Sequence, residues 1–386
     1  MPFRFSLLRP SILCAGILGL FYACVSPYEA DFVVDAIVLI VDGTVTDLPE
    51  KQVLKIARTK IFNGIPATVP VEAAKVDILV NGQTTISLRE GSVKGQYEAP
   101  GSFRGQVGSS YQLRFQTAEG QRYESTVEVM QRTPTIEKVY NRFDAAGSFN
   151  TERTRFRPAN LIYVDFQDPA SEHNYYRWTW TLWERQTWCA TCQQGIYNLS
   201  ANALSGSCQT LRSLPSSNLY DYNCLGSCWE IIRSLDINLL DDVYSNGRPV
   251  VGRLTAVVPY YQNQGALIEI RQASQSRAAY RYDKLLQDQS QNTGGLADTP
   301  PAPLIGNVRN LADEKDNVSG YFGASSVALV RYWLDRQNVS GLPITLFVGL
   351  NNRPPSPEPP AGVRPPTAVC ASSENRTPIQ PEGWQR

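Results

Sequence analysis

The chain has 386 residues, with 36 Lys plus Arg balanced by 36 Asp plus Glu and a single histidine. A nucleic-acid surface needs clustered excess Lys and Arg to displace phosphate counterions, so this balance argues against nucleic acid as a partner. The 27 Gly, 26 Pro, 19 Tyr and 7 Trp, with only two Met, indicate an all-β, turn-rich and aromatic protein.

The first residues are typical of a lipoprotein signal peptide over 1–23. Arg4 and Arg9 form a cationic start, and the apolar stretch 11–23 is too short to span a bilayer as a helix. It is followed by Cys24, the residue that lipoproteins acylate. We therefore expect several acyl chains on Cys24 and a lasting membrane anchor. A secretory leader cut at another position is the alternative.

Residues 35–132 are expected to form an immunoglobulin-like β-sandwich, reached from the anchor through a tether over 24–34. Short segments with alternating apolar residues recur at regular spacing, which is the pattern of an antiparallel sandwich. Asn81-Gly82 predicts a type I′ hairpin, because both residues tolerate positive φ. Strands are expected at 37–45, 52–58, 75–80, 85–89, 95–99, 111–117 and 122–129.

A second, larger β-rich domain is expected over 133–350. Its aromatic strand alternates, with Tyr176, Trp178, Trp180 and Leu182 on one face and Arg177, Thr179, Thr181 and Trp183 on the other. We favour packing in a sandwich core over an aromatic platform for a glycan or peptide. Trp183 and Trp188 are the candidate exposed aromatic contacts. Later strands are expected at 228–233, 250–258, 266–272, 327–335 and 343–348, with one amphipathic helix at 276–289.

Six cysteines remain once Cys14 leaves with the leader and Cys24 takes the lipid. An even number in an exported protein predicts three disulfides, whose pairing the sequence leaves open. The alternative is a zinc site, since the two close cysteine pairs have the spacing of tetrahedral ligands. An oxidising compartment favours disulfides, which would organise the aperiodic insertion over 189–228. The six are Cys189, Cys192, Cys208, Cys224, Cys228 and Cys370.

Residues 351–386 contain nine prolines, which favours an extended polyproline tail over a packed core. Cys370 is the exception in this segment. A disulfide from it to the cysteine-rich insertion would hold the tail against the domain.

Several motifs occur in order in the second half: Gly294-Gly295-Leu296-Ala297-Asp298-Thr299-Pro300-Pro301-Ala302-Pro303, Gly306-Asn307, and Gly320-Tyr321-Phe322-Gly323-Ala324-Ser325-Ser326. Together they resemble domain-of-unknown-function family 4249, lipoproteins of Bacteroidota outer membranes. The resemblance covers essentially the whole mature chain to about residue 348. It implies an N-terminal immunoglobulin-like or carboxypeptidase-regulatory-like sandwich, a larger β-domain and frequent association with TonB-dependent receptors. It implies no established activity or ligand.

The sequence offers no catalytic constellation. His173 is the only histidine, and its polar neighbours are typical of a solvated loop. No P-loop, dinucleotide fingerprint or His-Glu-x-x-His motif occurs. Asp165 with Asp168, and Asp241 with Asp242, could be calcium ligands, but exposed loop acids are the favoured interpretation. We therefore expect no cofactor and no metal.

Two functions from different classes follow. The favoured one is a non-enzymatic, lipid-anchored protein of the outer membrane, facing the cell surface, that helps a TonB-dependent receptor capture or admit a substrate. The ligand itself cannot be named from the sequence. The alternative is a surface hydrolase of glycan or peptide, which needs two carboxylates about 5 to 10 Å apart.

Overall fold

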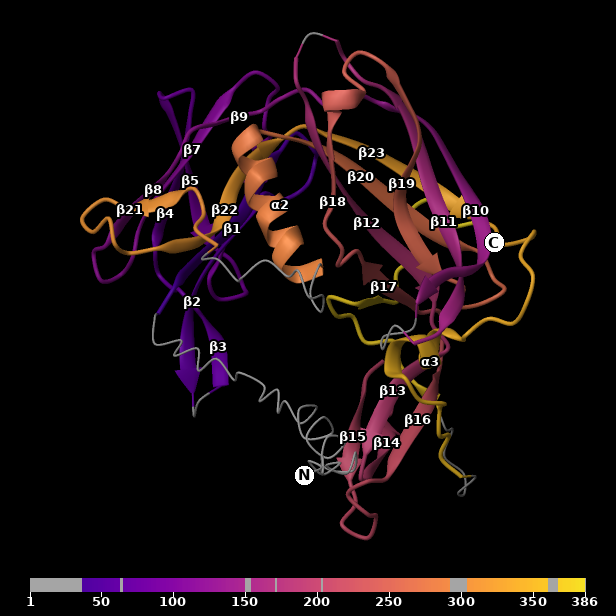
Figure 1. Cartoon of the computed structure of the whole chain (residues 1–386). Coiled ribbons are helices and arrows are strands. Elements are labelled where there is room, and N and C mark those ends of the chain that lie inside the picture. Colours follow the sequence, from indigo (N-terminus) through magenta and orange to yellow (C-terminus); the bar gives the residue numbers. More distant parts are fainter. Residues whose placement is uncertain are drawn as a thin grey trace, which may run out of the picture. The chain divides into compact units, whose positions relative to one another are not determined.

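The structure is a computed structural model that describes residues 37–62, 65–149, 154–170, 172–202, 204–291, 304–359 and 367–385. The expected leader, the tether over 24–34 and the lipid site Cys24 lie outside these residues, as does the segment 294–303. Val38–Arg386 forms one compact unit, built mainly from strands (Figure 1), which confirms the all-β expectation. No helix among the residues described is long and apolar enough to cross a membrane.

The N-terminal strands form one hydrogen-bonded path around a single core. The core side chains include Val41, Tyr97, Tyr111 and Leu113, all essentially inaccessible to solvent. The path runs β21-β8-β7-β4-β5-β6-β2-β1-β22, with β3 beside β2 and β9 beside β7. The first nine strands are β1 Leu39–Thr46, β2 Val53–Phe62, β3 Ile65–Pro70, β4 Lys75–Val80, β5 Thr84–Glu90, β6 Gln96–Glu98, β7 Ser110–Gln116, β8 Arg122–Ser125 and β9 Glu128–Val129.

The seven strands expected in this region are all present. The turn at Asn81-Gly82 is also confirmed, because both residues have positive φ, 52° and 68°, and the Gln83 N–H donates to the Val80 carbonyl. The hairpin loop has three residues and not two, since Val80 pairs with Thr84. Two further details differ from the expectation. No strand is expected at the position of β3, and the expected strand 122–129 is divided into β8 and β9.

Two strands from much later in the chain complete this first sheet. They are β21 (Val308–Asn310), which pairs with β8, and β22 (Val318–Ser325), which pairs in parallel with the whole of β1. The expected range 35–132 omits both, since parallel pairing of distant segments leaves no local pattern. At Gly320 the φ is +87°, and a Cβ would lie 2.0 Å from the Val41 carbonyl oxygen, so glycine alone permits this close pairing.

Two further sheets face each other across a second core, which contains Phe166, Trp178, Leu182 and Ile268. Tyr176 and Leu182 are fully buried and Arg177 and Trp183 are not, which confirms the alternation predicted for this strand. One sheet is β10-β11-β19, and the other is β23-β20-β12-β17-β25 with β18 beside β12. The bounds are β10 Ile136–Phe149, β11 Phe156–Gln167, β12 Tyr175–Arg185, β17 Trp229–Arg233, β18 Asn238–Asp241, β19 Pro249–Pro259, β20 Ala266–Gln275, β23 Val327–Leu334 and β25 Arg376–Thr377.

The expected helix is confirmed as α2 (Arg277–Gln291). A short 3-10 helix, η2 (Asp242–Tyr244), directly follows β18. The strand expected at 343–348 is wrong, because helix α3 (Leu346–Asn351) occupies this part of the chain. Thr345 is its N-cap, and the Thr345 side chain accepts a hydrogen bond from the Val348 N–H. Such a cap favours a helical turn over continued extension.

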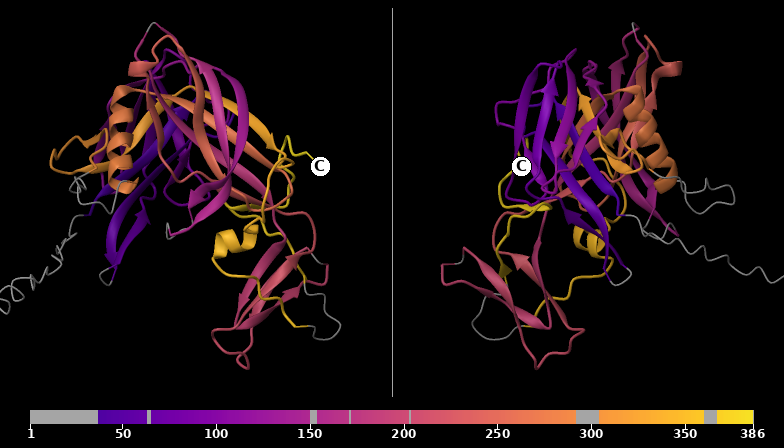
Figure 2. Two further views of the ribbon diagram at one scale, coloured as in Figure 1. Left: turned by 45° about the vertical axis from the view of Figure 1, so that its right-hand side comes forward. Right: turned by 90° about the vertical axis from the view of Figure 1, so that its left-hand side faces the viewer.

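The cysteine-rich insertion folds into two small sheets, so the expectation of an aperiodic loop is wrong. The strands are β13 Trp188–Gln193, β14 Gly195–Leu199, β15 Gly206–Thr210, β16 Leu219–Cys224 and β24 Thr367–Ala368. Figure 2 shows these strands gathered beside α3. Three disulfides are confirmed, and the thiol zinc site is thereby excluded. The pairs are Cys189 with Cys224, Cys192 with Cys208, and Cys228 with Cys370.

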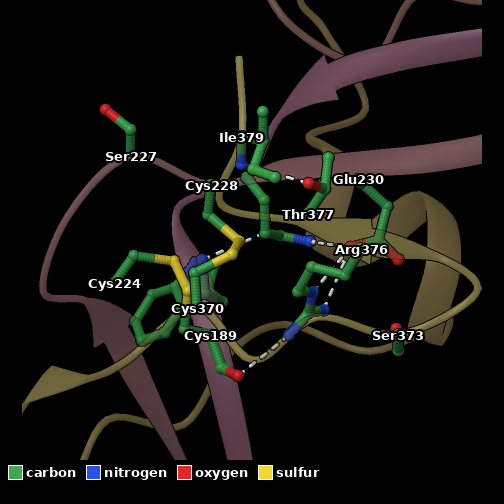
Figure 3. Close-up of a disulfide and its surroundings, with 12 residues drawn as sticks. Cys189, Cys224, Ser227, Cys228, Glu230, Cys370, Ser373, Arg376, Thr377 and Ile379 are labelled. Atoms are coloured by element: carbon green, nitrogen blue, oxygen red, sulfur yellow. Dashed lines mark hydrogen bonds and ion pairs between the residues drawn. A yellow bond between two sulfur atoms is a disulfide. The ribbon is translucent and has the colours of Figure 1, made fainter. Parts of the chain in front are cut away.

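The proline-rich segment is packed against the body wherever it is described, so the expected extended tail is wrong for 351–359 and 367–385. β24 pairs with β16 and β25 pairs with β17. Trp384 lies 5.8 Å from Trp229 and 5.1 Å from Trp333, measured between ring centroids. Figure 3 shows the Cys228–Cys370 disulfide beside Arg376, which donates to the Cys189 carbonyl and to Glu230. The disulfide predicted from Cys370 to the insertion is confirmed, whereas composition indicates none of the other contacts.

Candidate functional site

A cavity of about 380 Å³ lies between helix α2 and the β1–β22 edge of the first sheet. The helix contributes Ala279, Tyr282, Asp283 and Leu286, which are spaced as one helix face. On β1, Ile40, Asp42 and Thr44 line the cavity, while the alternate residues Leu39, Val41 and Val45 are buried in the first core. The cavity wall is therefore the outer face of the first sheet, opposite the core.

A hydrogen-bonded network of charged side chains forms one part of the wall. Arg177 Nη1 donates to Asp283 at 2.9 Å, and Gln275 Nε2 donates to the same carboxylate oxygen at 2.5 Å. Arg177 Nε and Gln275 Oε1 are buried and have no hydrogen-bond partner among the described residues. The network thus leaves one donor and one acceptor unsatisfied at the cavity wall.

A second polar group is centred on Tyr321 of β22. Its hydroxyl donates to Glu128 Oε1 at 2.7 Å, and its ring centroid lies 5.4 Å from that of Tyr282. Burial raises the pKa of the Tyr321 hydroxyl, and the hydrogen bond to Glu128 raises it further. Tyr321 therefore stays a neutral donor, and the two rings give this part of the cavity an aromatic surface.

Negative charge predominates in the cavity, because its lining includes the carboxylates of Asp42, Glu128 and Asp283 but only one guanidinium, that of Arg177. Such a lining suits a ligand that offers hydrogen-bond donors or positive charge. The four residues come from β1, β9, α2 and β12, so no local signal in the sequence indicates that they lie together. The expected helix at 276–289, the expected strand at 37–45 and the motif at 320–326 each contribute to the wall, but nothing in the sequence showed that they meet.

The sequence-predicted aromatic contacts lie elsewhere. Trp183 is half-buried on β12, cross-strand from Ile231 and Leu267. Trp188 is also half-buried, and its ring centroid lies 5.7 Å from that of Phe347 in α3. Neither side chain lines the cavity.

Two of the four acids interpreted as exposed loop residues are in fact buried. Asp168 accepts hydrogen bonds from the Tyr176 hydroxyl at 2.6 Å and from the Gly247 N–H at 3.0 Å. Asp242 has no exposed surface either. The neighbouring residues in the sequence do not distinguish an acidic side chain in a solvated turn from one that the fold buries beneath a loop. His173 is partly exposed, as expected for a loop histidine.

Comparison with known families gives one match. Residues 25–330 match the model of a family described as "Domain of unknown function (DUF4249)". The chain belongs to this family. No curated protein and no solved structure matches it. The family match spans the cavity and the cysteine-rich insertion and ends within β23, before α3 and the C-terminal segment.

Proposed function

We propose that this DUF4249 protein is a non-enzymatic accessory lipoprotein of the outer membrane, anchored at the cell surface through acylated Cys24. In this proposal it docks on a TonB-dependent receptor and helps capture a substrate, with the cavity under α2 as the capture site. The observation that carries the proposal is the position of the β2–β3 hairpin.

The β2–β3 hairpin extends beyond the first sheet at the end where the chain enters from the N-terminus. Leu39, the first residue of β1, pairs with Arg58, so the rest of β2 continues past β1. At the base of the hairpin, the Thr59 N–H donates to the Val38 carbonyl. An anchor upstream of Val38 would therefore hold the hairpin close to the membrane and to neighbouring membrane proteins.

The far part of this hairpin carries large apolar side chains that face solvent. Phe62 is 50% exposed and Ile65, its cross-strand partner, is 69% exposed, with Ile61 exposed beside them. Exposed apolar residues that gather at one place mark interaction sites in soluble domains. The three disulfides support the same proposal, because such bonds persist in extracytoplasmic proteins.

The experiment is co-purification of the full lipoprotein from detergent-solubilised native outer membranes. We expect a TonB-dependent receptor with the wild-type chain, and at least a tenfold loss of it with the double substitution Phe62→Ser, Ile65→Ser. Leu235→Ser is the matched control, since Leu235 is 94% exposed away from the hairpin. Repeated recovery of the wild-type lipoprotein alone would contradict the proposal.

The anchor has a separate test. Metabolic labelling with a palmitate analogue should label the wild-type chain but not Cys24→Ala, which should be released from membranes. Loss of membrane attachment together with unaltered receptor binding in detergent would separate the anchor from the docking surface.

The second candidate, a hydrolase, is favoured by one observation. The cavity gathers Asp42, Glu128 and Asp283, and glycosidases work with two carboxylates across a cleft. Against it, Asp283 is ion-paired with Arg177 and Glu128 accepts from Tyr321, so both carboxylates already have protein partners. Turnover of any glycan or peptide that Glu128→Gln abolishes would establish the hydrolase instead.

A further inference from the structure

A histidine and two carboxylates meet at the opposite end of β12 from the cysteine-rich insertion. His173 precedes β12, Asp241 ends β18 and Asp242 opens η2. His173 Nε2 lies 2.5 Å from Asp241 Oδ1 and 3.2 Å from Asp242 Oδ1. One ligand atom from each side chain falls within 4.8 Å of the others.

The buried member of this cluster has an unsatisfied oxygen. The Asp242 side chain has no exposed surface, and its Oδ1 has no hydrogen-bond partner in the part of the chain that is described. This oxygen points at His173 Nε2, which makes its hydrogen bond to Asp241 instead. Burial of a carboxylate oxygen without a partner costs free energy. A cation bound at this position would offset that cost.

The surroundings hold one further buried carboxyl and, beyond ion-pair distance, the guanidinium of Arg277. A third buried carboxylate, Asp168, lies beside Asp242. Among the described residues, neither Asp241 nor Asp242 forms an ion pair with a lysine or arginine. Within the part of the chain that the structure describes, His173 is thus the one group of possible positive charge that contacts these two carboxylates.

The protein holds each side chain in place with other contacts. Asp242 Oδ2 accepts from the Asn174 N–H at 2.8 Å, and Asp241 Oδ1 accepts from the Val243 N–H at 3.0 Å. The His173 ring stacks on Tyr175, which packs in turn against Tyr280 of α2. In known metal sites, contacts of this kind orient the side chains that bind the metal.

We infer that His173, Asp241 and Asp242 bind one divalent transition-metal cation, for which Zn²⁺ is the probe. One imidazole nitrogen with carboxylate oxygens suits zinc or manganese, whereas calcium takes six to eight oxygen ligands. Tetrahedral ligands about 2.0 to 2.1 Å from a metal stand about 3.3 Å apart, close to the 3.2 Å observed between His173 and Asp242. His173, 46% exposed, can open its 2.5 Å hydrogen bond to Asp241 to admit the ion.

Calorimetric titration with ZnCl₂ tests this inference on the full lipoprotein in detergent, after treatment with a chelator. The protein must carry no polyhistidine tag, because His173 is its only histidine. We expect one Zn²⁺ per chain, and at least a tenfold weaker affinity in both His173→Gln and Asp242→Asn. Asp236→Asn, an exposed acid five residues before Asp241, is the control and should bind as the wild type does.

His173→Gln removes the hydrogen bond to Asp241 and the ring stack on Tyr175, so we expect a small fall in its thermal unfolding temperature without metal, and Zn²⁺ should no longer raise that temperature. MnCl₂ should compete for the site, and excess CaCl₂ should not. Absence of zinc binding, stoichiometric binding that survives both substitutions, or displacement by Ca²⁺ would each overturn the inference.

Discussion

Arg353, in the proline-rich C-terminal segment, makes two hydrogen bonds to the fully buried carboxylate of Asp221 in β16, at 2.7 and 2.8 Å. The same carboxylate accepts from the Ser356 N–H and the Thr191 hydroxyl. Asp221 therefore joins the C-terminal segment to the cysteine-rich insertion independently of any disulfide.

Asp221→Asn should lower the free energy of unfolding by about 1.5 to 3 kcal/mol, because the hydrogen bonds it weakens involve a charged acceptor. Urea unfolding of the purified protein measures the change. Arg142→Gln is the control, since its ion pair with Asp144 spans 4.0 Å at the surface and should count for less than about 1 kcal/mol. Equal effects of the two substitutions would show that Asp221 has no structural role.

The Asp221 contribution should also depend on pH. Burial alone would raise the pKa of this carboxyl, but the hydrogen bonds from Arg353, Ser356 and Thr191 outweigh burial and hold the pKa below its ordinary value of 3.8. A depressed folded-state pKa stabilises the fold above pH 3.8 and loses this effect as the pH falls through the folded value. The difference in unfolding free energy between wild type and Asp221→Asn should shrink in that acid range. A difference that stays constant down to acid pH would count against the ion pair.

Glu184 and Arg336 form an ion pair that is completely buried between β12 and the end of β23. Arg336 also donates to the carbonyls of Gln262 and Gln264. Glu184→Gln should cost about 3 to 5 kcal/mol, because it leaves a buried guanidinium without its counter-charge.

A double-mutant cycle separates the pair from the burial of each group. The double substitution Glu184→Met, Arg336→Met should destabilise the protein less than the sum of the two single substitutions. Additive effects in chemical unfolding would show that the two charges do not interact.

The Cys228–Cys370 disulfide should stabilise the protein more than Cys192–Cys208 does. The first spans 142 residues and the second 16, and the chain-entropy model predicts about 2 kcal/mol more for the longer loop. Paired serine substitutions at each bridge, compared by urea unfolding, measure the difference. Limited proteolysis should cut the C-terminal segment only in the variant that lacks the longer bridge. A larger loss from the shorter bridge would contradict the model.

The sequence predicts β1, β2 and β4 to β7 of the first sheet because these strands carry local signals. β4 has the expected bounds, Lys75–Val80, since its alternation ends at the Asn81-Gly82 turn. The sequence does not predict the long hairpin of β10 and β11, because β11 is buried through Ala159–Ile162 without alternation. Helix α3 was also not predicted, because the capping that favours it comes from the single side chain of Thr345 and leaves no periodic pattern.

The candidate site was much less predictable than the strands. Arg177 and Asp283 are 106 residues apart in the chain, and Tyr321 and Glu128 are 193 apart. Their contacts depend on how the sheets meet at α2, which no spacing in the sequence encodes. The burial of Asp168 and Asp242 depends in the same way on the fold of the loops around them.

The pairing of β1 with β22 also has a consequence for how the chain can fold. Residues 39–46 are made early, yet their partner strand, residues 318–325, leaves the ribosome or a translocation channel only when most of the polypeptide has already emerged. Pairings of such high contact order form slowly. Until β22 is available, the edge of β1 that it covers would remain unpaired and able to pair with another chain. Fragments that stop at residue 132 should for this reason be prone to self-association.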